Sequence, residues 1–388
     1  MIMKLLHKLR LAIPALFLVC TMILPSLALT PETADPLALE AVSAILIEAR
    51  TGQVLYEKNA DERLPPASVT KIMTILLVME AIDSAKITLT DMVSVSEDAA
   101  SMGGSQVYLK VGEQMSVEDM LKSVIIASAN DCAYALAEFI SGSEDAFVAR
   151  MNERAAELGM TNTVFENTNG LDDATVNHMT TARDISLMSA ELIVKHPTVL
   201  TYSSIWMDSI RDGAFGLTNT NRLIRFYSGA NGLKTGSTSK AKFCISATAK
   251  RDDMQLIAVI MASPTRDMRN EAAKKLLDWG FAKYSFFVSE SGMCGDVRVL
   301  GGISDIVPTV TGEFTAVVGK GDEKKIERNI VLPEDVAAPV RAGDVVGEVE
   351  YLLGGEIIGK CDILASEEVG KISYFGIFEK LIKKFLLI

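Results

Sequence analysis

Histidine is scarce in this chain of 388 residues, which contains only three. One lies near the N-terminus, so His178 and His196 are the only candidates in the body of the chain. No serine stands in a G-x-S-x-G motif, and both absences disfavour a hydrolase built on a Ser-His-Asp triad. A CxxC pair and a histidine cluster are also missing, and we therefore predict neither a metal ion nor another cofactor.

Positive charge is also in deficit. The chain has 38 lysines and arginines against 50 acidic residues, which gives a formal net charge of −12. Because a nucleic-acid-binding protein normally carries a basic face, we expect no nucleic-acid partner. Hydrophobic residues make up 49% and charged residues 23%, as in ordinary globular proteins, and the length predicts two or three domains.

Acidic residues are absent from the first 28 positions. This segment starts with three basic residues, continues with an apolar run from Leu11 to Leu24, and ends in small residues at Ala28. This order is typical of a secretory signal peptide, which we predict over residues 1–28. An uncleaved anchor is the alternative, but the apolar run is short for a membrane span. We expect an exported protein.

The cysteines lack any close spacing. Four remain beyond the predicted signal peptide: Cys132, Cys244, Cys294 and Cys361. Export permits disulfides, and four cysteines allow three pairings. Cys132 and Cys244 lie within apolar runs, so we favour buried free thiols over disulfides.

The apolar pattern of residues 29–285 predicts a domain of strands and helices. The expected elements are two strands over 41–60, helices over 68–82, 117–126, 131–140 and 185–196, a hairpin over 241–263, and a helix over 268–281. Strands stand at both ends of a helical block, which favours an α+β fold with an antiparallel sheet flanked by helices. Short Val- and Ile-rich runs separated by glycine turns predict a small all-β domain over 286–370.

The first of three motifs is S-V-T-K, which joins Ser68 to Lys71. On a helix these positions share a face, so the Lys71 amine lies beside the Ser68 hydroxyl. A serine hydroxyl is a weak nucleophile and needs a base. Apolar neighbours and the helix dipole lower the pKa of Lys71, so the neutral amine could accept the Ser68 proton. An N-cap serine with a surface lysine would produce the same letters.

Two further motifs follow in the chain. In the motif S-A-N, an extended loop would point Ser128 and Asn130 the same way, the first to relay a proton and the second to hold a substrate backbone. The alternative is a cap between two helices. In K-T-G, Lys234 and Thr235 suit a carboxylate, and Gly236 leaves room for a ligand backbone beside a strand. The alternative is an edge-strand lysine before a turn.

The order of the three motifs is informative. S-x-N follows S-x-x-K by 60 residues, and K-T-G follows by 106 more. This motif set is characteristic of penicillin-binding proteins and class A β-lactamases. From about Leu37 to the C-terminus the chain resembles the serine D-alanyl-D-alanine carboxypeptidases, which are low-molecular-mass penicillin-binding proteins. The text around the motifs, at 67–74, 167–171 and 231–236, is similar to that family as well.

The resemblance implies a β-lactamase/transpeptidase-like catalytic domain and an acyl-enzyme cycle on a peptidoglycan stem peptide that ends in D-Ala-D-Ala. Ser68 would attack the carbonyl between the two D-alanines, Lys71 would act as general base, and water would then release the peptide. The backbone N–H groups of Ser68 and Ser237 would form the oxyanion hole. Ser128 and Asn130 would assist proton transfer and positioning.

The same resemblance assigns the carboxylate site. Lys234 and Thr235 would hold the terminal carboxylate beside Gly236 and Ser237, with Arg269 as a further contact. β-Lactams mimic the dipeptide and would acylate Ser68 covalently.

Two positions depart from the family pattern. Some members carry His after K-T-G, where this chain has Ser237. Some carry Arg inside an N-x-N segment, where this chain has Thr220, with Arg222 displaced by two positions. The sequence does not determine which residues replace that His and that Arg near the K-T-G motif.

Two alternative functions remain. A class A β-lactamase needs a deacylating Glu in an E-x-x-L-N setting. Glu166 stands near the expected distance, but the following N-T-N-G-L lacks that pattern. A non-catalytic β-lactam sensor would need a signalling domain, and the sequence shows no sign of one. We favour the carboxypeptidase.

The tail over 371–388 predicts an amphipathic membrane-anchoring helix. Its large apolar residues fall on one helical face, and Glu379, Lys380, Lys383 and Lys384 fall on the other. Charges in its middle forbid spanning, so we expect it to lie in the bilayer interface at the outer face of the cytoplasmic membrane. A helix packed on its own protein is the alternative.

Overall fold

A five-stranded antiparallel sheet forms the centre of the N-terminal domain in the computed structural model, which describes residues 37–386. Its strand order is β2-β1-β9-β8-β7. The bounds are β1 Ser43–Glu48, β2 Val54–Lys58, β7 Ala230–Thr238, β8 Lys242–Arg251 and β9 Met254–Ser263. The strand pair predicted over 41–60 and the hairpin predicted over 241–263 are confirmed. The predicted signal peptide lies outside the described residues.

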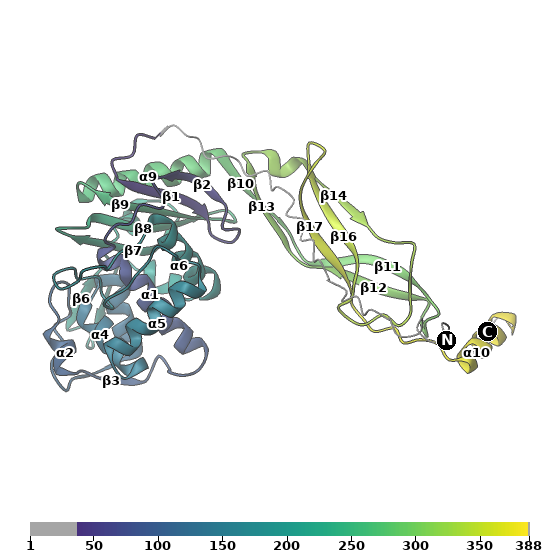
Figure 1. Ribbon diagram of the computed structural model, residues 1–388, viewed down its shortest axis with the longest axis horizontal. Helices are drawn as coiled ribbons and strands as arrows, with labels where there is room; N and C mark the ends of the chain where they lie inside the picture. Colours follow the sequence, from purple (N-terminus) through teal and green to yellow (C-terminus); the bar gives the residue numbers. More distant parts are fainter. Residues whose placement is uncertain (1–36, 387–388) are drawn as a thin grey trace, which may run out of the picture.

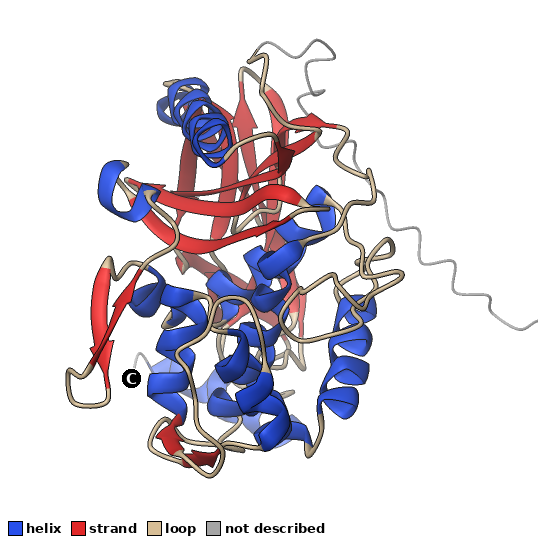
Figure 2. Cartoon of the chain, turned by 90° about the vertical axis from the view of Figure 1, so that its left-hand side faces the viewer, coloured by secondary structure: helices blue, strands red, loops and turns tan. Residues whose placement is uncertain are grey.

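Helices cover both faces of this sheet (Figure 2). Helix α9 (Arg266–Lys283) packs on one face, and most of the others form a block on the opposite face. The other helices are α1 Lys71–Asp83, α2 Glu97–Ser101, α3 Val117–Lys122, α4 Asn130–Ser141, α5 Glu144–Glu157, α6 Ala182–Lys195, α7 Val199–Ser203 and α8 Leu223–Phe226. Two small antiparallel sheets of two strands complete the domain, β3 Met92–Ser94 with β4 Gln114–Ser116, and the hairpin β5 Met207–Ile210 with β6 Phe215–Thr218. The predicted α+β class is therefore correct.

Strand β9 shows how one sheet serves two cores. Ile257 and Val259 belong to the core on the side of α1, whereas Leu256 and Ala258 belong to the core under α9. Alternate residues of a strand point to opposite faces, so a strand covered on both faces must be apolar throughout. This explains why the run M-Q-L-I-A-V-I-M-A-S lacks polar alternation.

The helices differ locally from their predictions. The first one begins as a 3-10 turn over Ala67–Thr70 before α1 starts. Helix α3 passes into a π-helical turn over Ser123–Ala127. The helix predicted over 185–196 begins earlier, at Ala182, where Thr181 caps α6 by accepting from the amide of Asp184, and the Asp184 carboxylate accepts from Thr163.

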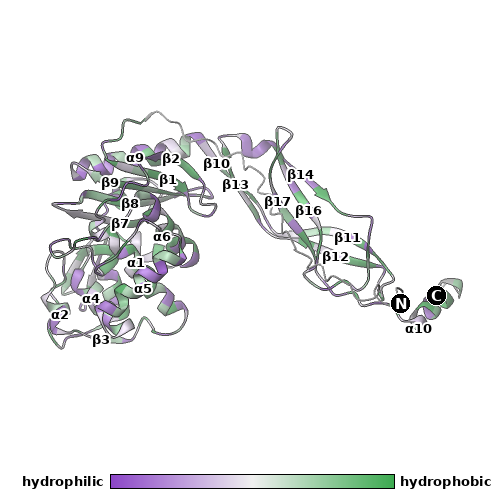
Figure 3. Ribbon diagram, viewed as in Figure 1, coloured by the Kyte–Doolittle hydropathy of each residue, from purple (hydrophilic) through white to green (hydrophobic). Residues whose placement is uncertain are grey.

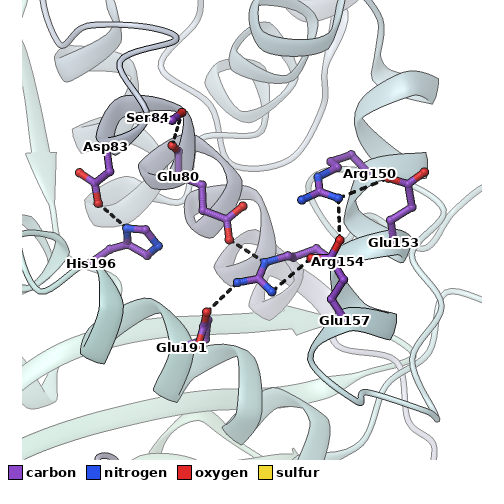
Figure 4. A network of polar contacts seen from close by, with 9 residues as sticks. All are labelled: Glu80, Asp83, Ser84, Arg150, Glu153, Arg154, Glu157, Glu191 and His196. Atoms are coloured by element: carbon purple, nitrogen blue, oxygen red, sulfur yellow. Dashed lines mark hydrogen bonds and ion pairs between the residues drawn. The ribbon is translucent and has the colours of Figure 1, made fainter. Parts of the chain in front are cut away.

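A charged network ties α1 to its neighbours (Figure 4). Arg154 on α5 donates to Glu80 on α1 and to Glu191 on α6, with N···O distances of 2.6 Å for both. His196, which follows α6, bonds to Asp83 at the end of α1. The C-terminal half of α1 is therefore fixed from two sides. Because the helix is one rigid element, these contacts also help to position its first residue, Lys71.

The second domain is built from β-strands, and the molecule is elongated (Figure 1). Its strands are β10 Tyr284–Ser289, β11 Gly292–Leu300, β12 Ile306–Thr311, β13 Phe314–Gly319, β14 Ile326–Val331, β15 Asp335–Ala337, β16 Val345–Leu353 and β17 Glu356–Ala365. Six of them form a sheet in the order β14-β16-β17-β12-β11-β15, and β10 pairs with β13. Phe314 stacks on Tyr351 with ring centroids 4.0 Å apart, at the edge of a separate apolar core.

Helix α10 (Tyr374–Leu386) stands at the far end of the molecule from the first domain (Figures 1 and 3). Its large side chains are strongly exposed: 94% for Tyr374, 86% for Phe375 and 90% for Phe385. Lys380 is the point of contact with the β domain, where its ammonium donates to the Gly302 carbonyl and the Asp305 carboxylate. Among the described residues, no helix has the length and apolarity needed to cross a membrane.

The four cysteines within residues 37–386 are free thiols. Cys132 and Cys244 are fully buried, as predicted, and burial raises the pKa of both thiols. Cys294 and Cys361 differ from the prediction because they are only partly buried, at the edge of the smaller core of the β domain.

Candidate active site

Ser68 lies in the 3-10 turn that precedes α1, where its neighbours hold it in place. The turn is tight, since Ala67 adopts a φ of 48°. The loop at Gly170 (φ 86°) lies against it so closely that a Cβ there would come 1.9 Å from the Ala67 carbonyl oxygen. Only glycine permits this approach. The sequence predicted a serine at the start of a helix, and the structure places it one turn earlier, half-buried and in contact with a cavity.

Lys71 is fully buried beside Ser68. Its Nζ lies 3.0 Å from Ser68 Oγ, 2.6 Å from Asn130 Oδ1 and 2.7 Å from the Asn169 carbonyl oxygen. Burial, and then the charge of Lys234, lower the pKa of Lys71 well below its usual value. The two carbonyl oxygens can only accept, so they take both hydrogens of the neutral amine. Its lone pair is then left for the Ser68 hydroxyl.

His178 supports the same turn from behind. The amide of Glu166 donates to His178 Nδ1, so Nε2 carries the hydrogen and donates to Thr70 Oγ1 over 2.7 Å. The Thr70 hydroxyl in turn donates to the Ala67 carbonyl. Burial lowers the pKa of His178 to about 4, so it stays neutral. This histidine therefore positions the Ser68 turn.

Ser128 and Asn130 reach the site by a different geometry from the predicted one. Ser128 has φ 64°, in the left-handed region, and Asn130 is the first residue of α4, so the expected extended loop is wrong. A π-helical turn over Ser123–Ala127 ends directly before this left-handed residue. Ser128 Oγ accepts from Lys234 Nζ at 2.8 Å, and Asn130 Nδ2 donates to the Gly103 carbonyl at 2.7 Å. The two side chains thus hold the two buried lysines.

The K-T-G motif lies on β7, directly against the Ser68 turn. A Cβ at Gly236 would meet the Pro66 carbonyl oxygen at 2.8 Å and the backbone nitrogen of Ser68 at 2.9 Å. Glycine is therefore required here by the chain itself, whereas the sequence suggested room for a ligand. Next to it, Thr235 Oγ1 donates to Thr220 Oγ1 at 2.8 Å, which orients the Thr235 hydroxyl.

One end of the site is strongly cationic. A cavity of about 610 Å³ is lined by Ser68, Ser128, Thr235, Gly236 and Ser237 from the motifs, by Arg222, Arg266 and Arg269, and by Ser105, Trp206, Thr218, Asn219, Thr220 and Phe226. No acidic side chain is among them. Burial and Arg269 lower the pKa of Lys234 to about 7, and burial and Arg266 lower that of Arg269 to about 10.

Arg269 is 3% exposed, and its guanidinium donates to Asn270 Oδ1 and the Cys244 carbonyl. Among residues 37–386, none of the three arginines forms an ion pair with a carboxylate. Arg269 is a buried cation without an acidic partner, which is costly, and Arg222 and Arg266 are exposed beside it, so this end of the cavity suits an anionic ligand group.

Several residues of the site were not found in the sequence. Asn169 acts through its main-chain carbonyl, which no side-chain pattern reveals. Arg266 stands one helical turn before Arg269, and this i,i+3 spacing is the signal that could have identified it. Within the described residues, no group of three or more His, Cys, Asp or Glu side chains could hold a metal ion.

Glu166, the residue on which the β-lactamase alternative depends, is committed to its own loop. Its two carboxylate oxygens accept from the backbone amides of Val176 and Asn177 at 2.8 and 2.9 Å. The carboxylate therefore closes a turn, which matches the structural role that the following N-T-N-G-L suggested.

Comparisons with known proteins agree along the chain. The sequence model of the family "D-alanyl-D-alanine carboxypeptidase" matches residues 30–265, and that of "Penicillin-binding protein 5, C-terminal domain" matches residues 282–371. The chain is 41% identical over 351 residues to the D-alanyl-D-alanine carboxypeptidase DacF of Bacillus subtilis, covering 89% of this chain and 90% of that protein. It is 36% identical to DacC of Escherichia coli, covering 91% and 90%.

Solved structures give the same result. Penicillin-binding protein 5 from Haemophilus influenzae matches with a TM-score of 0.76 at 32% identity, over 86% of this chain and 98% of that one. Penicillin-binding protein D2 from Listeria monocytogenes, in its ampicillin-bound form, matches with a TM-score of 0.58 at 32% identity, over 63% and 98%.

The contact between β7 and the Ser68 turn generates a prediction. We expect Gly236→Ala to slow covalent labelling of the protein by ampicillin at least tenfold, because the new methyl group must displace the backbone of the turn. Intact-protein mass spectrometry over time measures the rate.

Gly216→Ala on β6 is the matched control. A Cβ there meets nothing within 4 Å, so acylation should continue at the wild-type rate. Equal rates for the two variants would show that the close approach at Gly236 is unimportant.

Proposed function

Since this chain belongs to the D-alanyl-D-alanine carboxypeptidase family and is a serine-type enzyme of the penicillin-binding proteins, we propose that Ser68 is the residue that forms its acyl-enzyme. The substrate is a peptide that ends in D-Ala-D-Ala, and the product is free D-alanine. The observation that carries the proposal is the Lys71 amine, buried between two carbonyl oxygens with its third contact on Ser68 Oγ. We place the catalytic domain at residues 29–285.

The first half of the cycle is a transfer from the leaving D-alanine to Ser68. Lys71 takes the Ser68 proton while Oγ attacks the carbonyl between the D-alanines. The backbone N–H groups of Ser68 and Ser237 stabilise the oxyanion, and the close approach of Gly236 to the Ser68 nitrogen supports this pairing of segments. Ser128, held by Lys234, relays to the departing amine the proton that Lys71 took from Ser68, so Lys71 is neutral again.

The second half is hydrolysis. Water attacks the acyl-enzyme carbonyl while Lys71 accepts its proton, the bond to Ser68 Oγ breaks, Lys71 returns the proton to that oxygen, and the shortened peptide leaves. Asn130 keeps the Lys71 amine in place through both halves, because Oδ1 holds it at 2.6 Å.

The terminal carboxylate takes the cationic end of the cavity. Lys234, Thr235 and Arg269 line or border that end, and Arg222 and Arg266 add charge at its exposed rim. Gly236 and Ser237 form the adjacent edge of β7. β-Lactams carry a carboxylate in a comparable position and acylate the same serine.

The direct test is substitution of the nucleophile. Ser68→Ala should abolish both release of D-alanine from a D-Ala-D-Ala peptide and covalent labelling by ampicillin, because one hydroxyl serves both reactions. Ser84→Ala, at the exposed C-terminal end of α1, is the control and should retain both. If the Ser68 variant still becomes labelled, another residue is the nucleophile.

The buried lysines predict the pH dependence of kcat/KM. The rate should rise with pH as Lys71 loses its proton, with a midpoint far below the ordinary lysine value of about 10.4. It should fall again above about pH 7, because Lys234 loses the charge that attracts the carboxylate. Initial rates of D-alanine release from pH 4 to 10 measure both limbs.

Lys234→Arg separates the two limbs. Arginine stays charged across this range, so the falling limb should disappear while the rising limb remains. A wild-type rate that climbs steadily to pH 10 would contradict a neutral Lys71 base.

We place the β domain at residues 286–370 and propose that the segment 371–388 anchors the exported protein at the outer face of the cytoplasmic membrane. Lys380 points at the β domain. At 100° per residue, Phe378 and Phe385 lie roughly 160° and 140° around the helix from Lys380. The apolar face therefore points away from the protein, and its exposed aromatic side chains suit the interface of a bilayer.

Deletion from Tyr374 onward should release the protein from anionic vesicles without loss of carboxypeptidase activity. Each large apolar side chain contributes on the order of 1.5–3 kcal/mol when fully buried, so the helix supplies ample binding energy. Vesicle sedimentation of the mature protein decides the question, with Glu379→Gln on the polar face as a control that should still bind. If the full-length protein stays in the supernatant, α10 is a packed terminal helix.

A further inference from the structure

Three arginines face the end of the catalytic cavity that receives the terminal carboxylate. Arg222, Arg266 and Arg269 all line this cavity, and no acidic side chain is among its lining residues. Asp267, next to Arg266 in the sequence, does not line it either. A leaving D-alanine brings one carboxylate, so this end keeps an excess of positive charge. We propose that the enzyme also releases a terminal D-amino acid with a second carboxylate on its side chain, such as D-glutamate, an inference that rests on the proposed function.

The arginines stand at two depths. Arg269 is only 3% exposed, and under the proposed function it binds the main-chain carboxylate together with Lys234 and Thr235. Arg222 and Arg266 are exposed, and neither forms an ion pair within residues 37–386. Acidic groups of the described chain therefore do not compete for these two guanidinium groups. A ligand group that lies farther out than the main-chain carboxylate meets them first.

The spacing of the two levels matches a dicarboxylic residue. Arg266 and Arg269 are three residues apart on α9, so they share a helical face and lie about 4.5 Å apart along its axis. Four bonds of about 1.5 Å join the two carboxyl carbons of glutamate, which can stand roughly 5 Å apart. While Arg269 holds the main-chain carboxylate, the side-chain carboxylate therefore reaches Arg266.

Arg222 approaches the same place from another element. It stands directly before α8, whereas Arg266 begins α9. The charges of both act on Arg269, whose pKa falls to about 10, first through burial and then through Arg266. Both exposed arginines thus lie close to Arg269, and two guanidinium groups from different elements can bind one carboxylate.

Aromatic side chains stand beside the arginines. Trp206 and Phe226 both line the cavity, their rings meet edge-on with centroids 6.2 Å apart, and Phe226 is 68% exposed. The methyl group of D-alanine covers little of these rings. The methylene groups of a glutamate side chain add apolar surface against them, while the carboxylate at its end stays with the arginines at the rim.

The reaction is the proposed cycle with a different leaving group. As Ser68 Oγ forms the ester, the bond between the D-alanine carbonyl carbon and the D-glutamate nitrogen breaks. That nitrogen receives the proton that Ser128 relays. Water then hydrolyses the ester as before, so the reaction needs no additional reactant.

The experiment uses three blocked tripeptides that differ only in the residue after D-alanine, which is D-alanine, D-glutamate or D-glutamine. D-Glutamine has nearly the shape of D-glutamate without its side-chain charge, so the ratio of their kcat/KM values isolates the second carboxylate. For the wild-type protein we expect the D-glutamate peptide to exceed the D-glutamine peptide by at least about fivefold at low salt. High salt should reduce this preference, because the two outer arginines are exposed.

Substitutions of the outer arginines test the assignment. Arg266→Gln and Arg222→Gln should each lower the ratio, the double variant should make the two peptides equal, and Arg266→Lys should keep part of the preference because lysine retains the charge. A change that only disturbs the cavity or the main-chain carboxylate affects both peptides alike and cancels in the ratio. Arg328→Gln, which removes an exposed arginine of β14 outside the cavity, is the control and should keep the wild-type ratio.

The possible outcomes are distinct. Equal wild-type values for the D-glutamate and D-glutamine peptides overturn the proposal, and so does a preference that survives the double substitution. In both cases release of D-alanine from the D-Ala-D-Ala peptide still supports the proposed function. A wild-type protein that releases no D-alanine from that peptide refutes the proposed function itself.

Discussion

The burial of the Lys71 amine is the constraint on which the rest of this site depends. An ammonium at that position would be expensive, and burial together with the Lys234 charge lowers its pKa. The amine is not free to move away, because Asn130 and the Asn169 carbonyl hold it beside Ser68. The neighbouring elements serve this arrangement: α1 is clamped at its far end, α4 begins at Asn130, and the loop of Gly170 closes over the turn.

One end of the cavity is positively charged, in contrast to the negative net charge of the whole protein. The chain as a whole carries −12, yet Lys234, Arg269 and two exposed arginines face a cavity without an acidic lining residue. Such an arrangement costs folding free energy, which a bound carboxylate returns. The two lysines of the site also differ in their surroundings: Lys71 lies between two carbonyl oxygens beside Ser68, whereas Lys234 donates to the Ser128 hydroxyl and the Thr235 carbonyl and lies near Arg269.

Much of this could be predicted from local patterns. Local spacing in the sequence indicates three features: the continuous apolar run of β9, the Thr181 cap and the amphipathic tail helix. Spacing suffices for these because backbone periodicity acts over a few residues. The three motifs identify their residues because chemistry restricts which side chains can do the work. The predictions failed where the backbone leaves regular geometry, as at Ser128, which has a left-handed φ directly after a π-helical turn, and at Ser68, whose turn packs against the distant Gly170.

The sequence by itself determined the class of the protein and singled out the candidate nucleophile, its candidate base and the motif residues that the structure brings around them. Tertiary structure alone decided why Gly236 must be glycine, that Asn169 contributes only a carbonyl, that Glu166 closes a loop, and that Arg266 joins Arg269 at the cavity. The physical reason is range. Residue type and spacing encode local geometry and reactivity, whereas close approach, desolvation and main-chain contacts exist only when segments a hundred residues apart meet.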